Sequence, residues 1–147
     1  MVYHLMSEED VGLIMRHPWV AFASDSGVLI SGDGVPHPRG YGNTARVLGD
    51  YVRSRRILRL EEAVRKMTSL PAEHFRFENR GTIKEGYAAD ITIFDRSKVA
   101  DTATFVQPHA FPAGLPYVIV NGVVVVRKGQ QTGARPGQVL MGSAVAP

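Results

Sequence analysis

The sequence predicts an α/β segment followed by an all-β segment, and three features support this prediction. The apolar run Val20–Ala23 reads as a short strand buried on both faces, and it lies between two helical patterns. Such strands are typical of parallel sheets covered by helices. After Asn79 the pattern changes from helical to extended. The dipeptide Asn121-Gly122 separates two runs of β-branched residues and favours a two-residue hairpin, because that turn needs positive φ at both central positions.

The first helix is expected to begin after Ser7 and to end by His17. Ser7 can cap the helix, and the acids that follow it oppose the positive end of the helix dipole. Pro18 ends the helix, since the residue before a proline avoids the α region. The expected apolar face consists of Val11, Ile14 and Met15. Residues 2–6, ahead of this helix, are one further candidate strand.

Two longer helices are expected in the middle of the chain. The first begins at Asn43, and its expected buried face consists of Val47, Leu48, Tyr51 and Val52. The second covers residues 60–70, and its expected inward side chains are Leu60, Val64 and Met67. Pro71 can occupy the first position of one more short helical turn, where its missing N–H costs nothing.

The second half of the chain predicts about four strands. The expected strands are residues 81–83, 89–95, 117–120 and 123–127, and a loose strand is expected in the tail after Gln130. A Pro-rich connector runs from residue 107 to 116. The hairpin is strongly apolar and its edges invite pairing, while the strand at residues 20–23 has too few neighbours within the chain. Both observations suggest that partners of this chain are missing from it.

Composition limits what this chain can do. Its 147 residues suit one domain, and 44% hydrophobic residues are enough to build a core. The absence of cysteine excludes disulfides and thiolate metal sites within the sequence. No run approaches the roughly 18 apolar residues that a membrane span needs, so we expect a cytoplasmic protein without membrane contact. Arg53, Arg55, Arg56 and Arg59 cluster with few aromatics between them, and we interpret them as a solvated helix end rather than a nucleic-acid site.

Asp25 is the first candidate for a catalytic residue. It stands where the predicted strand ends, and chemistry collects beyond the carboxyl ends of strands in α/β sheets and barrels. The structural alternative is an aspartate that closes the strand in an Asx-turn. The Gly/Pro-rich loop that follows carries His37 and Arg39, and a guanidinium fork matches the two oxygens of a substrate carboxylate. For Arg39 the alternative is an exposed loop arginine.

Three stretches carry a resemblance to a known family. FASDSG, followed by PHPRGYGNTARVLGDYVR, resembles the strand-eight aspartate and the HPR loop of the N-acyl-D-amino-acid deacylases, or D-aminoacylases. GTIKEGYAADITIFD is similar to a β-sandwich segment shared across the amidohydrolase superfamily. YVIVNGVVVVRKGQQTGARPGQVL resembles the closing hairpin and tail of the deacylases. The chain therefore resembles the C-terminal portion of such an enzyme.

This resemblance implies a fold and a set of roles. Residues 1–78 would be the end of a (β/α)8 metal-dependent hydrolase barrel, with its last strand and helices, and residues 79–147 would be part of a β-sandwich. Asp25 resembles the aspartate that takes a proton from metal-activated water and passes it to the leaving amine. Arg39 resembles the arginine that holds the α-carboxylate of an N-acyl-D-amino acid, and His37 belongs to the same substrate-binding loop. In this chain Ser26 stands between Asp25 and Gly27, where the family loop usually continues directly to glycine.

The resemblance also implies Zn²⁺, whose main ligands the sequence lacks. The family uses a His-x-His pair, a cysteine and further histidines from earlier barrel strands, and the histidines of this chain show no ligand spacing. Asp25 is the one candidate metal ligand. We therefore expect the chain to be inactive alone and to act with an N-terminal barrel segment. The alternatives are a non-catalytic module that self-associates through its strand edges, or another amidohydrolase specificity such as cyclic-imide hydrolysis.

Overall fold

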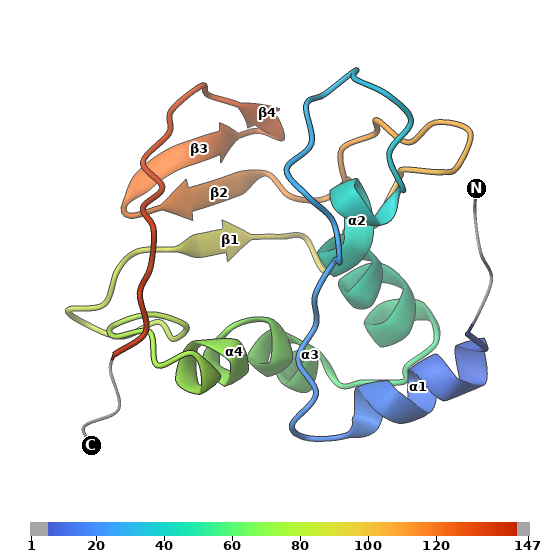
Figure 1. Cartoon of the computed structure of the whole chain (residues 1–147), viewed down its shortest axis with the longest axis horizontal. Coiled ribbons are helices and arrows are strands. Elements are labelled where there is room, and N and C mark those ends of the chain that lie inside the picture. The colour runs from blue at the N-terminus through green and yellow to red at the C-terminus, as the bar shows by residue number, and fades with distance from the viewer. Residues whose placement is uncertain (1–5, 144–147) are drawn as a thin grey trace.

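Helices occupy the first half of the chain and a small antiparallel sheet occupies the second half (Figure 1). The computed structural model describes residues 6–143. The helices are α1 (Glu8–Arg16), α2 (Arg39–Arg46), the π-helix η1 (Val47–Ser54), α3 (Leu60–Met67) and α4 (Ser69–His74). The strands are β1 (Ile91–Ile93), β2 (Tyr117–Val120), β3 (Val123–Arg127) and β4 (Gln130–Gln131). The candidate strand at residues 2–6 falls almost entirely outside the described residues.

Helix α1 begins and ends where its sequence predicts. The hydroxyl of Ser7 accepts a hydrogen bond of 3.0 Å from the backbone N–H of Asp10. His17 ends the helix in an extended conformation directly before Pro18. Met15 is buried on the expected face, whereas Ile14 remains largely exposed. The local capping signals therefore determine both ends of this helix.

Helices α2 and η1 form one continuous rod and supply most of the core. The rod begins at Arg39, earlier than the predicted start at Asn43, because the residues after Pro38 already have helical dihedral angles. The face predicted to be buried is buried, and the core consists of Met15, Ala45, Val47, Leu48, Tyr51, Val52, Leu58, Ala63 and Val99. Gly49 lies so close to the Val99 carbonyl that a Cβ atom there would stand 2.5 Å from its oxygen. The π-helical turn thus packs directly on the chain at residue 99.

The predicted helix at residues 60–70 is divided in two. Thr68 has φ −132° and ψ −87°, which ends α3 and starts α4. Val64, expected to face inward, is exposed, while Ala63 and Lys66 are buried instead. Leu60 and Met67 pack against the core as predicted, so the predicted inward face is wrong only at Val64. Lys66 is buried beside them, although lysine is rarely found inside a protein. Pro71 lies inside α4 rather than at its first position.

The four strands form a single antiparallel sheet in the order β1-β2-β3-β4. Asn121 and Gly122 have φ values of 47° and 80°, which confirms the predicted two-residue hairpin. The predicted strand at residues 89–95 is observed only at Ile91–Ile93, and the loose strand of the tail is β4. The prediction of a strand at residues 81–83 is wrong. Gly81 has a φ of 81°, and Ile83 is exposed without a strand beside it in the described sheet.

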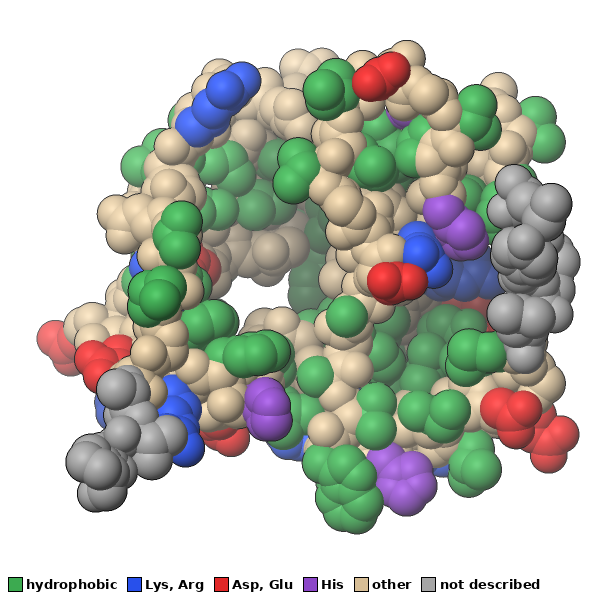
Figure 2. Space-filling view, viewed as in Figure 1, with side chains coloured by type: hydrophobic (Ala, Val, Ile, Leu, Met, Phe, Trp, Pro, Cys, Tyr) green, Lys and Arg blue, Asp and Glu red, His purple; other side chains and the backbone are tan. Residues whose placement is uncertain are grey.

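The predicted buried strand at residues 20–23 is also wrong. The segment is extended, but within residues 6–143 no strand pairs with it, and Ala21 and Ala23 are exposed. Its one backbone contact to a neighbouring element runs from the Phe22 N–H to the Lys66 carbonyl, at 3.4 Å. Figure 2 shows an opening through this face of the molecule, between the sheet, the helices below it and the extended segment. A strand needs a neighbouring strand for its backbone hydrogen bonds, and the described residues supply none beside residues 20–23.

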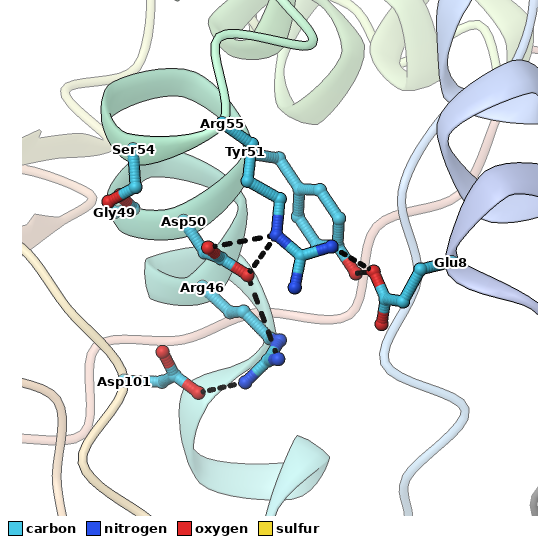
Figure 3. Close-up of polar contacts among 8 residues, drawn as sticks. All are labelled: Glu8, Arg46, Gly49, Asp50, Tyr51, Ser54, Arg55 and Asp101. Carbon is cyan, nitrogen blue, oxygen red and sulfur yellow. Dashed lines mark hydrogen bonds and ion pairs between the residues drawn. The ribbon is translucent and has the colours of Figure 1, made fainter.

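A polar network joins helix α1 to the α2–η1 rod (Figure 3). Arg55 pairs with Glu8 at 2.5 Å and with Asp50 at 3.1 Å, and the Tyr51 hydroxyl donates to the same Glu8 carboxylate. Arg46 extends the network to Asp101 at 3.0 Å. The arginine cluster is therefore only partly a solvated helix end. Arg53 is half-buried and donates to the Arg96 and Val99 carbonyls, whereas Arg56 and Arg59 are exposed as expected.

Candidate active site

The structure brings Asp25 and Arg39 together as an ion pair. The Arg39 Nη2 atom lies 2.7 Å from Oδ2 of Asp25, and the two side chains are 42% and 87% exposed, respectively. Asp25 has a φ of 48°, a left-handed conformation that is uncommon outside glycine but that aspartate adopts more often than most residues. This conformation ends the extended segment and turns the carboxylate toward α2. Asp25 and Arg39, which the sequence analysis selected separately, thus belong to one site.

Helix α3 holds the segment that leads to Asp25. The ammonium group of Lys66 is fully buried and donates hydrogen bonds to the carbonyls of His17 and Val20. The Arg65 guanidinium donates to the Pro18 carbonyl beside them. Burial lowers the pKa of Lys66, and Glu62 opposes this shift. A buried ammonium is stable only when hydrogen-bond acceptors surround it, so these carbonyls explain why Lys66 is inside.

Arg39 is placed by the start of helix α2. Its backbone N–H donates to Nδ1 of His37 at 3.1 Å, so the His37 ring satisfies a donor at the beginning of the helix. Residues Ser26 and Leu29 of the loop pack against Gly40, the residue after Arg39. A Cβ atom at Gly40 would collide with the Leu29 side chain and would stand 2.6 Å from the Ser26 hydroxyl. Glycine at position 40 therefore lets the loop pack directly beside Arg39.

His37 belongs to this site through its backbone contact with Arg39. Its ring also meets Phe105 edge to face, with ring centroids 5.0 Å apart. Burial, and after it the positive charge of Arg39, lowers the pKa of His37 below its ordinary value of 6.5. Both causes favour the neutral imidazole, which is the form that can accept the Arg39 N–H.

His109 is a residue of this region that the sequence reasoning did not select. Its Nδ1 accepts the backbone N–H of Gly32 at 3.2 Å and lies 2.9 Å from the Tyr41 hydroxyl. Its Nε2 lies 3.0 Å from the Gly34 carbonyl oxygen. The loop between Asp25 and Arg39 is therefore bound to a segment far away in the sequence. No spacing rule could have indicated this pairing.

The candidate site is open rather than a closed pocket. A cavity of about 500 Å³ lies elsewhere, beside the end of η1, and four arginines line it: Arg53, Arg56, Arg59 and Arg96. It includes neither Asp25 nor Arg39. Within residues 6–143, no group of three His, Asp or Glu side chains is arranged to hold a metal ion. None of the helices described has the length and apolarity needed to cross a membrane.

The arrangement supplies two chemical functions on one exposed surface. A carboxylate can accept and return a proton, and a guanidinium can bind another carboxylate through two parallel hydrogen bonds. Ion pairs between exposed side chains contribute only about 0–1 kcal/mol, so the Asp25–Arg39 pair can open at little cost. The described residues offer no metal site and no enclosing wall, so both must come from elsewhere if a closed active site forms here.

Comparisons with known proteins relate the chain to one family of hydrolases. Residues 4–126 match the family described as Amidohydrolase family. The chain is 44% identical over 140 residues to the N-acyl-D-aspartate deacylase of Alcaligenes xylosoxydans xylosoxydans, covering 95% of this chain and 27% of that protein. The chain thus spans less than a third of the length of that relative.

Solved structures show the same relationship. The crystal structure of a D-aminoacylase superimposes with a TM-score of 0.88 and 41% identity, covering 95% of this chain and 29% of that one. The N-acyl-D-glutamate deacylase of Bordetella bronchiseptica superimposes with a TM-score of 0.82 and 43% identity, covering 92% and 28%. That structure contains zinc and a phosphonate inhibitor that mimics the tetrahedral intermediate of the reaction.

Proposed function

We propose, from the premise that this chain belongs to the amidohydrolase family, that it carries the C-terminal part of an N-acyl-D-amino-acid deacylase site. The reaction would hydrolyse the amide bond of an N-acyl-D-amino acid and release a carboxylate and a free D-amino acid. Relatives named for this activity match about 95% of the chain. In this proposal Asp25 transfers the proton, Arg39 binds the substrate, and His37 supports Arg39.

The single observation that carries the proposal is the carboxylate already bound to Arg39. The Asp25 carboxylate lies 2.7 Å from the Arg39 guanidinium, a distance typical of a charge-assisted hydrogen bond. Every N-acyl amino acid carries an α-carboxylate of the same chemistry. Because the exposed pair is weak, a substrate carboxylate can take the place of Asp25 on Arg39. The same exchange would release Asp25 for proton transfer.

Asp25 then has a defined chemical task. Its carboxylate accepts the proton of the water that attacks the amide carbonyl, and it returns that proton to the nitrogen as the carbon–nitrogen bond breaks. The amine leaves neutral, and the acyl group leaves as a carboxylic acid that ionises in solution. Atoms and charge balance with one water consumed.

Zinc belongs to the proposal only through residues outside this chain, apart from Asp25 as a candidate ligand. A zinc ion supplies polarisation of a carbonyl and activation of water when it is bound. The described residues alone do not fit such an ion, since no group of three suitable side chains lies together among them. We assign the remaining ligands to a barrel segment that complements this chain.

The exposed apolar surface supports such a complementing segment. Val28, Ile30 and Val35 of the loop beside the site are exposed, as is Trp19 on the extended segment. Apolar side chains gathered around a candidate active site are typical of a surface that another part of the protein covers. In this proposal residues 1–78 complete the barrel in the cytoplasm, and residues 79–147 form part of the sandwich.

The test reconstitutes the site. This chain is mixed with zinc and with the N-terminal barrel segment of a related deacylase, and hydrolysis of an N-acetyl-D-amino acid is measured. Asp25→Asn should lower kcat by about a hundred- to ten-thousandfold, as expected for loss of a general acid–base. Arg39→Lys should raise KM by about ten- to a hundredfold, because hydrogen bonds between charged groups contribute about 1.5–3 kcal/mol.

Matched variants separate these effects from changes in the fold. Asp33→Asn alters an exposed aspartate of the same loop, and Arg56→Lys alters an exposed arginine away from the site; both should keep wild-type kinetics. No hydrolysis by the wild-type mixture, from a chain that is folded and monodisperse, would reject the deacylase and favour the non-catalytic module. Hydrolysis of cyclic imides instead would reassign the specificity.

A further inference from the structure

The loop between Asp25 and Arg39 has one partly buried aliphatic side chain, Leu29, which packs beside Gly40. Val28, Ile30 and Val35 are all exposed, and Val28 is completely so. Gly32 and Gly34 both have positive φ, at 88° and 61°, and a Cβ atom placed on either residue would meet no other part of the chain within 4 Å. A loop of this kind loses conformational entropy when it is ordered, and few buried contacts compensate for that loss. Away from Leu29, the conformation of the loop therefore depends largely on polar contacts.

His109 makes those contacts at the tip of the loop. The Gly32 N–H can only donate and the Gly34 carbonyl can only accept, so together they determine the tautomer of the ring. Nδ1 is unprotonated and accepts from Gly32, while Nε2 carries the hydrogen and donates to Gly34. In this tautomer the Tyr41 hydroxyl, at 2.9 Å, must also donate to Nδ1. One imidazole thus joins the loop tip to the first turns of α2.

The segment that carries His109 is itself firmly held. Ala100 and Ala113 close its base with reciprocal backbone hydrogen bonds of 3.3 and 2.9 Å. The Thr102 hydroxyl donates to the Phe111 carbonyl at 2.6 Å, one step further along. Directly below, Val99 is buried in the core. Figure 1 shows this segment, between β1 and β2, beside the loop that precedes α2.

The same segment touches the loop at a second point, close to Arg39. Phe105 meets the His37 ring, and His37 accepts the Arg39 backbone N–H. Tyr41, which His109 binds, also meets the Phe111 ring edge to face, with centroids 5.5 Å apart. Residues 101–113 therefore hold both the loop tip and the start of α2, and Arg39 lies between these two attachments.

We propose that His109 is a positioning residue, which holds the loop between Asp25 and Arg39 and so fixes Arg39 for the substrate carboxylate. This proposal rests on the deacylase function proposed above. His109 touches neither Asp25 nor Arg39, so its loss should affect the binding of substrate more than the chemical step.

The experiment compares His109→Leu, which removes both ring contacts, with His109→Asn. The Asn Oδ1 atom can still accept the Gly32 N–H, but the shorter side chain has no atom at the position of Nε2, so the hydrogen bond to the Gly34 carbonyl is lost. Hydrogen exchange of the chain, followed by mass spectrometry, should show amides of residues 26–38 exchanging about tenfold faster in His109→Leu. His109→Asn should lie between this variant and the wild type, and peptides of the β2–β3 hairpin should not change.

Kinetics of the reconstituted enzyme supply the second measurement. His109→Leu should raise KM about tenfold and leave kcat within about twofold of wild type. His74→Leu, a change at an exposed histidine elsewhere on the chain, should alter neither exchange nor kinetics. Unchanged exchange of residues 26–38, or faster exchange with unchanged KM, would overturn the proposal. Inactivity of the wild-type mixture would instead reject the deacylase function, and it is seen before any variant is compared.

Discussion

The two residues of the candidate site are held in opposite ways. Arg39 begins a helical rod whose next turns form the core, with Val47 almost fully buried. Asp25 ends an extended segment that is bound to α3 through backbone carbonyls and has no strand beside it among residues 6–143. One half of the site is therefore part of the core, and the other half rests on its surface.

This difference shows that the two regions are stabilised differently, one by contacts within the described fold and the other by neighbours that it lacks there. The rod buries an apolar face against neighbours that the same chain supplies, so its stability is internal. The segment before Asp25 has the composition of a buried strand, but the described residues place no strand beside it. The rod should therefore keep its conformation in any context, whereas the proposed barrel segment would change the environment of residues 20–23.

The sharpest test of this comparison is a pair of truncations. Leu48→Ala in the rod should lower the free energy of unfolding by about 2–5 kcal/mol, because it leaves a cavity in the core. Val28→Ala in the loop should change it by no more than about 0.5 kcal/mol, because Val28 is fully exposed. Urea unfolding of both variants measures the difference. Equal losses would show that the loop is packed and would break the comparison.

A smaller effect is expected from the hydrogen bonds that Lys66 of α3 donates to the extended segment. Lys66→Met should keep most of the buried volume but leave the His17 and Val20 carbonyls without their donor, at a cost of about 1–3 kcal/mol. Hydrogen exchange of residues 17–24 should quicken while that of the rod does not.

Lys98→Met is the matched control, since Lys98 is exposed and forms an ion pair with Asp95, three residues earlier. If Lys66→Met is no more destabilising than Lys98→Met, the buried ammonium does not hold the segment. The segment would then depend on apolar contacts such as those of Phe22 with the core.

The smallest expected effect is a pH dependence at His37. Its pKa is lowered in the folded chain, chiefly by burial and then by Arg39, so the unfolded chain binds the proton more tightly. This contribution to stability is complete above the ordinary pKa of 6.5 and is lost as pH falls from there through the lower pKa of the folded state. His37→Asn keeps an acceptor for the Arg39 N–H but does not titrate.

Urea midpoints at pH 7.5 and 5.5 measure this effect. The wild type should lose more stability between the two pH values than His37→Asn, with the other histidines common to both. An identical pH dependence in the two proteins would show that the His37 ring is as solvated in the folded chain as in the unfolded one.

The sequence by itself determined the features whose causes lie within a few residues. The Ser7 cap, the stop before Pro18, the buried face of the α2–η1 rod and the Asn121-Gly122 hairpin all follow from local hydrogen bonding and periodicity. The resemblance carried by the residues around Asp25 and Arg39 also pointed to the family that the comparisons show. Whether these two residues perform the roles assigned to them stays a prediction.

Only the tertiary structure decided the features that depend on distant neighbours. It placed Asp25 on Arg39, buried Lys66 beneath two carbonyls, and set His109 against the tip of the loop. It also left residues 20–23 without a sheet, although their composition is that of a buried strand. The physical reason is the same in each case. Hydrogen bonds and burial each require a second group. A sequence pattern shows which face of a segment must be covered, but it does not show which distant residues cover that face.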